Sequence, residues 1–126
     1  MKVTSVVPQL RTTDIEASIR FYTETLGFDL GFRYEDFYAG VRIGDFEIHL
    51  KLVDNEDPSV PFVREGGHLH FFILIDDPVS YAETLKSRGV ALVREPFTTS
   101  YSIDEFIIED NQGYRLHFAK AGGEPE

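Results

Sequence analysis

The hydrophobic and polar positions in the first half of the chain predict a strand, a helix and then three strands. Residues 3–10 predict a strand because β-branched residues are frequent there, and Pro8 limits that strand to a sheet edge or to an exchange between chains. Residues 14–27 predict a helix because apolar residues recur at steps of four, three and four. That spacing places them on one helical stripe: Ile15, Ile19, Tyr22 and Leu26.

Both ends of this helix carry boundary signals. Thr13 and Glu16, three residues apart, have the pattern of a capping box, in which a hydroxyl and a carboxylate satisfy free backbone donors. Gly27 is expected to end the helix, because a left-handed residue is favoured there. Three strands of a meander are predicted next, with a turn at Gly44–Asp45 before the last of them: residues 28–34, 37–43 and 46–53.

The second half repeats this order after an irregular segment. Residues 54–67 are acidic, carry two prolines and end in paired glycines, so we interpret them as a linker. A strand at residues 68–76 precedes a helix that is expected to begin at Asp77–Pro78 and to close at Gly89. The apolar side of that helix is predicted as Val79, Ala82 and Leu85. Three more strands complete the half: residues 91–99, 104–110 and 114–121.

A repeated triplet supports an internal duplication. Ile48-His49-Leu50 and Leu116-His117-Phe118 occupy the last predicted strand of each half. Because side chains alternate across a strand, apolar residues that pack on the helix place both histidines on the opposite face. The pattern predicts an α+β fold of two βαβββ modules, divided as follows: a first module at 1–53, a linker at 54–67, a second module at 68–121 and a flexible tail at 122–126.

Composition and charge narrow the classes of partner. The formal net charge is −10, which repels nucleic-acid phosphates and anionic lipid headgroups and attracts cationic ligands. An ordinary soluble acidic surface is the alternative explanation of this charge. The lack of cysteine removes disulfides, thiolate chemistry and zinc–sulfur sites and is neutral about compartment. The apolar runs have strand length, and Met1 is not followed by the pattern of a secretion signal. We therefore expect no nucleic-acid partner, no membrane partner and a cytoplasmic location.

Several segments resemble the glyoxalase/bleomycin-resistance/dioxygenase (vicinal oxygen chelate) superfamily over about residues 3–120. The opening of the chain is similar to the opening of these proteins, and residues 106–114 resemble their last hairpin, with Asn111 where proline is usual. Glu35-Asp36-Phe37 and Ala39-Gly40-Val41 resemble the bleomycin-resistance branch in particular. The resemblance implies two βαβββ modules that form a curved mixed sheet around a concave cavity.

The resemblance to bleomycin-resistance proteins also implies a function. Members of that branch form homodimers, often with exchange of the N-terminal strand near a proline such as Pro8, and sequester a cationic drug in a groove of the dimer without catalysis. Core packing is the alternative role for each aromatic candidate. The ligand-binding residues expected here are Phe32, Phe37, Tyr38, Glu47, His49, His70, Phe72, Tyr101 and His117.

Enzymatic relatives bind a divalent metal at four positions, which fall here near Val7, His49, His68 and His117. Val7 has no ligand atom, but three imidazoles and a water molecule can hold zinc, nickel or iron, and His70 could replace His68. Metal-free relatives also carry a histidine in the last strand. In addition, the glutamates that move protons in glyoxalases are replaced here by His49 and His117.

We therefore expect a non-enzymatic protein that binds a small molecule, with no cofactor and with no catalytic residue assigned. The competing hypothesis is a metal-dependent lyase, isomerase or dioxygenase that uses His49, His68 and His117. The chain contains no tryptophan, which argues against bleomycin itself as the ligand, because its flat ring system would be held mainly by aromatic stacking.

Overall fold

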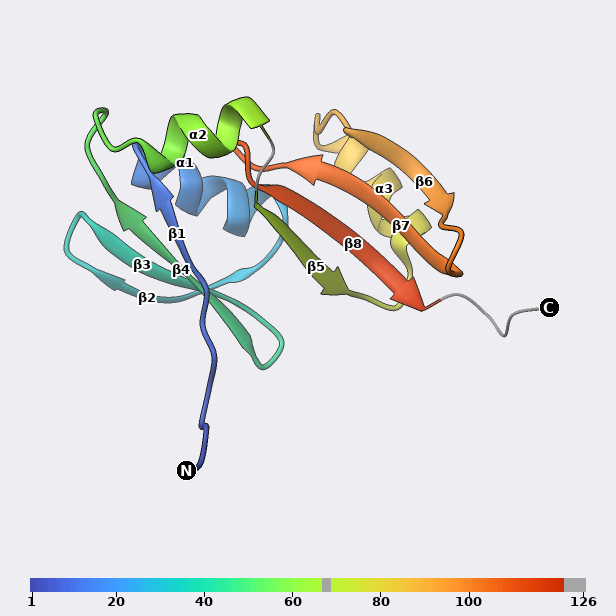
Figure 1. Cartoon of the computed structure of the whole chain (residues 1–126), viewed down its shortest axis with the longest axis horizontal. Helices are drawn as coiled ribbons and strands as arrows, with labels where there is room; N and C mark the ends of the chain where they lie inside the picture. Colours follow the sequence, from blue (N-terminus) through green and yellow to red (C-terminus); the bar gives the residue numbers. More distant parts are fainter. Residues whose placement is uncertain (67–68, 122–126) are drawn as a thin grey trace. The chain divides into compact units, whose positions relative to one another are not determined.

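The computed structural model describes residues 1–66 and 69–121, and the chain divides into two compact units, Met1–Pro61 (unit 1) and Phe62–Glu126 (unit 2). Each unit contains a four-stranded mixed sheet, and a helix packs on one face of that sheet (Figure 1). The α+β fold class with two βαβββ modules, which the sequence predicted, is confirmed.

In unit 1 the sheet has the strand order β1-β4-β3-β2. β1 runs parallel to β4, and the other neighbours are antiparallel. Gln9 and Gly40 both lie opposite His49 in the register, so these three positions share one face of the sheet. The strands are β1 (Gln9–Thr12), β2 (Asp29–Tyr34), β3 (Tyr38–Ile43) and β4 (Phe46–Leu52).

The helix of unit 1 packs on β3 and β4 and consists of α1 (Ile15–Arg20) followed directly by a π-helical turn, η1 (Phe21–Thr25). The Asp14 side chain is the N-cap and accepts the backbone N–H of Ala17 at 3.0 Å. The prediction that Thr13 is the N-cap of a capping box is wrong by one residue. The N-cap is the next residue, Asp14, whose carboxylate accepts the hydrogen bond from Ala17. The predicted stripe is confirmed as buried: Ile15, Ile19, Tyr22 and Leu26.

Unit 2 has the equivalent strand order, β5-β8-β7-β6, with β5 parallel to β8. Its hairpin β7–β8 pairs Ile107 with His117 and Glu105 with Ala119. The predicted strand at 91–99 begins only at Arg94. The strands are β5 (His70–Leu74), β6 (Arg94–Thr98), β7 (Ile103–Glu109) and β8 (Arg115–Ala121).

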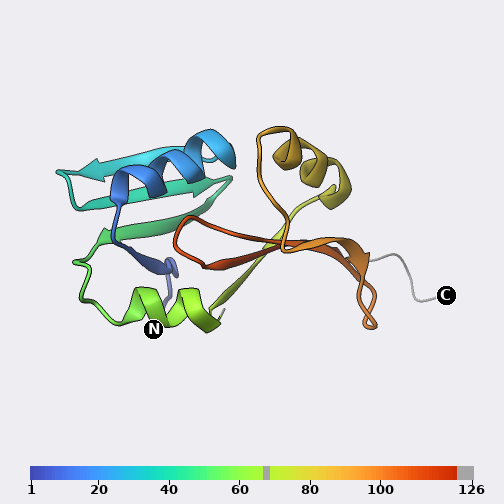
Figure 2. The same cartoon turned by 90° about the horizontal axis from the view of Figure 1, so that it is seen from above.

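The unit 2 helix, α3 (Pro78–Ser87), packs mainly on β7, and Figure 2 shows it along one face of its own sheet. Asp77 caps the helix by accepting the Ser80 N–H at 3.1 Å, as the Asp77–Pro78 signal predicted. Val79 is 57% exposed, so its assignment to the apolar side is wrong. Because the helix begins at Pro78, steps of four and three bury a different set: Pro78, Ala82 and Leu85.

The segment before β1 differs from the prediction of a strand at residues 3–10. β1 begins at Gln9, and residues 1–8 run away from the unit 1 sheet (Figure 1). Pro8 has no N–H group to donate to a ladder, and only its carbonyl participates, accepting the His49 N–H at 2.9 Å. Val3 and Val6 are therefore exposed.

The segment interpreted as a linker contains a helix that the sequence analysis missed, α2 (Ser59–Gly66). Val60 and Val63 lie three residues apart, and both are buried, although two prolines obscure this period in the sequence. Hydrogen bonds from Ser59, and then the Arg11 guanidinium, hold the pKa of Asp57 below its usual value just before this helix.

Among the described residues, no helix is long and apolar enough to cross a bilayer.

Alternation in the last strand of each unit places the histidines as predicted. Ile48 and Leu50 are buried in β4, which packs against α1, whereas His49 points to the other face and is partly exposed. In β8, Leu116 and Phe118 are fully buried on the α3 side. The sheet face opposite the helix in each unit is therefore the face that carries titratable side chains.

Candidate functional site

Unit 1 carries a connected group of polar and aromatic side chains on the sheet face opposite α1. We call it the unit 1 cluster, and it consists of Gln9, Phe32, Tyr38, Glu47 and His49. Tyr38 Oη lies 2.9 Å from His49 Nδ1, and His49 Nε2 lies 3.2 Å from Glu47 Oε1. Gln9 Nε2 donates to Tyr38 Oη at 3.1 Å. Four predicted ligand-binding residues are thus in mutual contact.

The chemistry of these groups sets the direction of each hydrogen bond. An ionised carboxylate only accepts, so His49 donates Nε2–H to Glu47. In the tautomer with a proton on Nε2, the lone pair is on Nδ1, which accepts the Tyr38 O–H. The result is a carboxylate–imidazole–phenol chain in which Gln9 supplies the last donor. Such a chain orients the rings and leaves polar atoms at a partly exposed surface.

Phe32 forms the aromatic wall of the unit 1 cluster. Its ring lies edge-to-face with His49, with the centroids 5.2 Å apart, and nearly parallel to Tyr38 at 6.2 Å. Gly40 lies directly beneath it in β3. A Cβ atom at Gly40 would overlap both Phe32 Cε1 and Glu47 Oε1. The absence of a side chain at this position therefore makes room for the cluster.

Replacement of Gly40 by alanine is expected to displace Phe32 and Glu47 and to lower the free energy of unfolding by about 1–2 kcal/mol, the usual range for one added methyl group in a packed site. Because Phe32 would leave the edge of His49, the ring protons of His49 should lose its ring-current shift in NMR spectra. Gly44→Ala is the control for the NMR signal, since no atom lies within 4 Å of its Cβ position, and its φ of 58° means that it loses stability from backbone strain alone. Unchanged His49 resonances in Gly40→Ala would contradict the packing described here.

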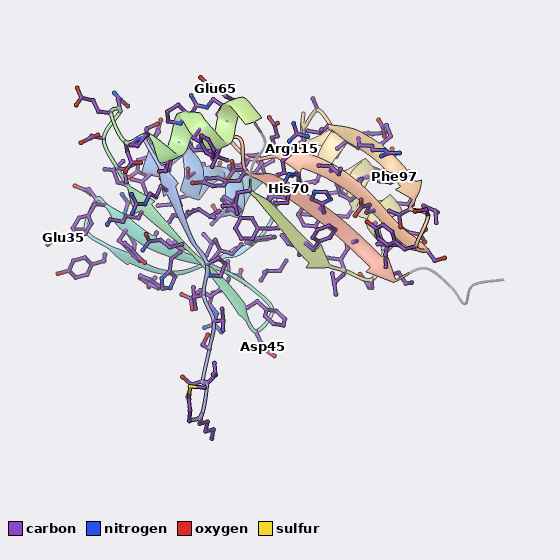
Figure 3. The ribbon with its side chains drawn as sticks, in the orientation of Figure 1. Glu35, Asp45, Glu65, His70, Phe97 and Arg115 are labelled. Atoms are coloured by element: carbon purple, nitrogen blue, oxygen red, sulfur yellow. The ribbon has the colours of Figure 1, made fainter. Side chains whose placement is uncertain are left out.

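Unit 2 carries a second group on the face opposite α3, the unit 2 cluster, which consists of His70, Phe72, Glu105 and His117. His70 Nδ1 lies 2.8 Å from His117 Nε2. Phe72 stacks on His117 with centroids 4.4 Å apart and an interplanar angle of 28°, and it is 57% exposed. Figure 3 shows His70 beside Arg115, its register partner in β8.

His117 and Glu105 are the buried members of the unit 2 cluster. Their exposed fractions are 8% and 4%, and His117 Nδ1 lies 3.5 Å from Glu105 Oε2. Burial holds the pKa of His117 below its usual value, and the Glu105 carboxylate opposes this shift. The ring of His117 is therefore neutral at pH 7, with one nitrogen as donor and the other as acceptor.

Two predicted site residues lie elsewhere, and a third is not among the described residues. Phe37 is in the turn between β2 and β3 and contacts Tyr34 edge-to-face at 5.5 Å. Tyr101 is 66% exposed in the turn between β6 and β7. His68 lies outside the described residues. The contacts that define the two clusters include neither Phe37 nor Tyr101.

Glu105 was missed as a site residue. The sequence contained a usable signal, because Phe106 and Ile108 are apolar and alternation turns Glu105 to the opposite face of β7. Its proximity to His117 depends on the hairpin register, which pairs Ile107 with His117 and makes Glu105 a diagonal neighbour.

The described donors do not fit the metal site expected by resemblance. In residues 1–66 and 69–121, no three His, Asp or Glu side chains are grouped to hold an ion. His49 has partners at both ring nitrogens, and His117 directs Nε2 to His70 and Nδ1 toward Glu105. Val7 has no donor atom in its side chain. We therefore describe the chemistry of both clusters without a metal-dependent step.

Comparison with known proteins supports one superfamily. Residues 3–118 match the family model described as "Glyoxalase/Bleomycin resistance protein/Dioxygenase superfamily". A probable chloroplastic lactoylglutathione lyase of Arabidopsis thaliana is 29% identical over 92% of this chain, but the chain spans only 35% of that relative. A lactoylglutathione lyase of Haemophilus influenzae is 25% identical over 86% of each protein.

A solved structure agrees with the family match. The bleomycin-binding protein of bleomycin-producing Streptomyces verticillus, complexed with copper(II)-bleomycin, superposes with a TM-score of 0.74. The alignment covers 98% of this chain and 99% of that chain, at 25% identity. The structural match therefore extends over nearly the whole of both chains.

Proposed function

Because the chain belongs to the glyoxalase/bleomycin resistance protein/dioxygenase superfamily and has its vicinal-oxygen-chelate fold, we propose that it is a non-enzymatic binding protein for a cationic, aromatic small molecule. It would sequester this ligand in the cytoplasm, in the manner of bleomycin-resistance proteins. The sheet faces opposite the helices would supply the binding residues in both units.

One observation carries this proposal: in both units a ring, an imidazole and a carboxylate occupy the same face of the sheet. Phe72 stacks on His117 and is more than half exposed, so its outer face can receive a flat ligand. In unit 1, Glu47 is partly exposed near the Phe32 ring, which provides a negative charge for a cation. Aromatic surface combined with a carboxylate is the chemistry expected for an aromatic cation.

The similarity to the Streptomyces verticillus protein supports this class of ligand, because that protein is complexed with copper(II)-bleomycin. The net charge of −10 adds long-range attraction for a cation. The lack of tryptophan still argues against an assignment of bleomycin as the natural ligand. Bleomycin is therefore the first probe and not the conclusion.

We also propose a homodimer that exchanges its N-terminal segments. Residues 1–8 form no strand with their own sheet, and Val3 and Val6 are exposed, so a second copy can cover them. Light scattering should give twice the mass of the chain, and deletion of residues 1–7 should give a monomer. A monomeric full-length protein at micromolar concentration would contradict the dimer.

Calorimetric titration with bleomycin tests the binding function. Binding at micromolar concentration is expected, with affinity reduced about tenfold by Phe72→Ala, since an aromatic stack contributes about 0.5–1.5 kcal/mol beyond its area. Phe46→Ala is the matched control, because Phe46 is also exposed but alternates away from His49 in β4. Absence of heat with bleomycin, or equal losses in both variants, would contradict the proposed site.

A metal-dependent lyase, isomerase or dioxygenase is the second candidate. It is favoured by the two lactoylglutathione lyases among the relatives. Metal analysis of the untagged protein, followed by titration with zinc, nickel and iron(II), separates the candidates. About one metal per chain that is lost in His117→Ala would favour the enzyme, because such stoichiometry requires a specific site.

A further inference from the structure

Gln9 is a polar residue of the unit 1 cluster to which the proposed binding function gives no role. It lies in β1, at the edge of the unit 1 sheet, and its side chain is exposed. Within the described part of the chain this side chain makes one hydrogen bond, from Nε2 to Tyr38 Oη at 3.1 Å. Because a carboxamide has two N–H donors and an oxygen acceptor, the direction of this bond decides which atom Gln9 turns away from Tyr38.

That direction follows from the other end of the hydrogen-bonded chain, at Glu47. An ionised carboxylate only accepts, so His49 donates Nε2–H across the 3.2 Å contact with Glu47 Oε1. His49 Nδ1 then accepts the single proton of the Tyr38 hydroxyl, at 2.9 Å. Tyr38 Oη has no second proton and can only accept from Gln9. Gln9 therefore directs Nε2 toward Tyr38 and its carbonyl oxygen, Oε1, away from it.

We propose that Gln9 Oε1 is the acceptor for an amide N–H group of the ligand, and that Glu47 is a positioning residue that fixes this acceptor through His49 and Tyr38. The inference rests on the proposed binding function and adds a neutral hydrogen-bond donor to the ligand class. Gln9 touches the ligand at this contact, whereas Glu47 acts on it only through the two residues between them.

The common direction of these hydrogen bonds strengthens the acceptor. Gln9 donates to Tyr38, Tyr38 donates to His49, and each bond in such a series polarises the next. An amide that donates through its nitrogen becomes a better acceptor at its oxygen. Because the amide plane is already held by Tyr38, a ligand also loses less conformational freedom of the protein when it binds.

The charges on this sheet face favour a neutral donor over a charged one. Register and alternation place three basic and two acidic side chains on the face of the unit 1 cluster: Arg11, Arg42, Lys51, Asp29 and Glu47. Asp57 pairs with Arg11 at 2.9 Å and balances the third basic group. Since the two signs are balanced, a full charge at Gln9 is not favoured, and hydrogen bonding decides the preference.

Two aromatic side chains adjoin the Gln9 amide. Tyr38 meets Gln9 through its hydroxyl, and the ring of Phe32 lies nearly parallel to the ring of Tyr38 with the centroids 6.2 Å apart. Phe32 is 38% exposed. The ring of an aromatic amide would pack on this surface with its N–H directed to Gln9. The ligand class is therefore an aromatic compound that carries an amide N–H.

The first test is the direction of the hydrogen-bonded chain, read by NMR without a ligand. In the native protein the Nε2 protons of Gln9 should show nuclear Overhauser effects to the Tyr38 ring, and two-bond ¹H–¹⁵N correlations should show His49 protonated at Nε2. Glu47→Gln should weaken both signals, because the introduced amide can donate to His49 as well as accept from it. Asp45→Asn is the matched control, since it removes a carboxylate from the turn before β4 and leaves Glu47 in place.

A native His49 protonated at Nδ1 would overturn the inference. The same would follow if Glu47→Gln left both NMR signals unchanged, because Glu47 would then not set the direction of the chain.

The second test compares benzamide with acetophenone, two neutral probes that share a ring and a carbonyl, of which only benzamide has N–H donors. Benzamide should bind about fivefold more tightly, the contribution of one hydrogen bond. Gln9→Leu should reduce this ratio to about one and Glu47→Gln to about twofold, whereas Asp45→Asn should keep it. Absence of benzamide binding at millimolar concentration, equal binding of both probes, or an unchanged ratio in Gln9→Leu would overturn the ligand class.

These outcomes are independent of the bleomycin titration. If bleomycin fails to bind while the native direction of the chain and the preference for benzamide hold, the proposed function fails and the role of Gln9 stands. If bleomycin binds while Glu47→Gln leaves the NMR signals and the probe ratio unchanged, the binding function stands and the joint role of Gln9 and Glu47 is refuted.

Discussion

Replacement of Phe118 by alanine is expected to lower the free energy of unfolding by about 3–5 kcal/mol, the range for loss of a buried aromatic ring. Phe118 is fully buried in β8, where it stacks on Phe106 with centroids 5.3 Å apart and meets the Tyr81 ring of α3 edge-to-face at 4.9 Å. The substitution would leave a cavity between the sheet and the helix. Urea denaturation, monitored by circular dichroism, measures the change.

Phe72→Ala is the matched control for this prediction. Phe72 lies in β5 of the same sheet but on the opposite face, and 57% of it is exposed, so its loss should cost less than about 1 kcal/mol. A similar loss for both variants would show that the sheet does not have one buried core face and one exposed face as described. The comparison therefore tests the sheet orientation on which the unit 2 cluster depends.

Gly113→Ala is expected to destabilise the protein by about 2–4 kcal/mol, because strain at positive φ and overpacking add together. Gly113 has φ = 96°, a conformation that L side chains rarely adopt, and a Cβ atom there would lie 2.8 Å from Arg64 Cα. Since that neighbour is backbone, a side-chain rotation cannot relieve the overlap. Thermal and urea unfolding both report the loss.

Gly89→Ala separates strain from steric overlap. Gly89 ends α3 with φ = 85°, but no atom lies within 4 Å of its Cβ position. This variant should therefore lose about 1–2 kcal/mol from backbone strain alone. If Gly113→Ala is no more destabilising than Gly89→Ala, the close approach of Arg64 to the β7–β8 turn is absent in solution.

The turn at Gly113 matters for the site because it sets the register of β7 and β8. In that register Glu105 is a diagonal neighbour of His117, and Asp110 Oδ1 accepts the N–H groups of Gln112 and Tyr114 within the turn. A shift by one residue would move Glu105 to the α3 face. The stability of the turn and the chemistry of the unit 2 cluster are thus linked.

The two clusters use a histidine at the same place in different ways. His49 is partly exposed and connects Glu47 to Tyr38, and both of these side chains are partly exposed as well. His117 is buried and lies between Glu105, which is also buried, and His70. The same position in the last strand of each unit therefore carries a histidine that belongs to a partly exposed group in unit 1 and to a buried group in unit 2.

Local pattern determined the elements of each unit. The apolar stripe of α1 and the capping aspartate of α3 follow from neighbours three or four residues away, so a sequence contains all the information needed to predict them. Alternation in β4 and β8 likewise placed His49 and His117 opposite the helices. Helical spacing gave the wrong buried side at Val79, because the starting residue of the helix decided which side was buried.

Tertiary structure decided what the sequence could not. The contact of Glu105 with His117 depends on a hairpin register, and the room for Phe32 depends on Gly40 in a neighbouring strand. Residues 1–8 form no strand with their own sheet, because Pro8 removes the donor that would pair them locally. Short-range periodicity determines elements and faces, whereas proton positions and ligand chemistry depend on contacts between residues distant in the chain.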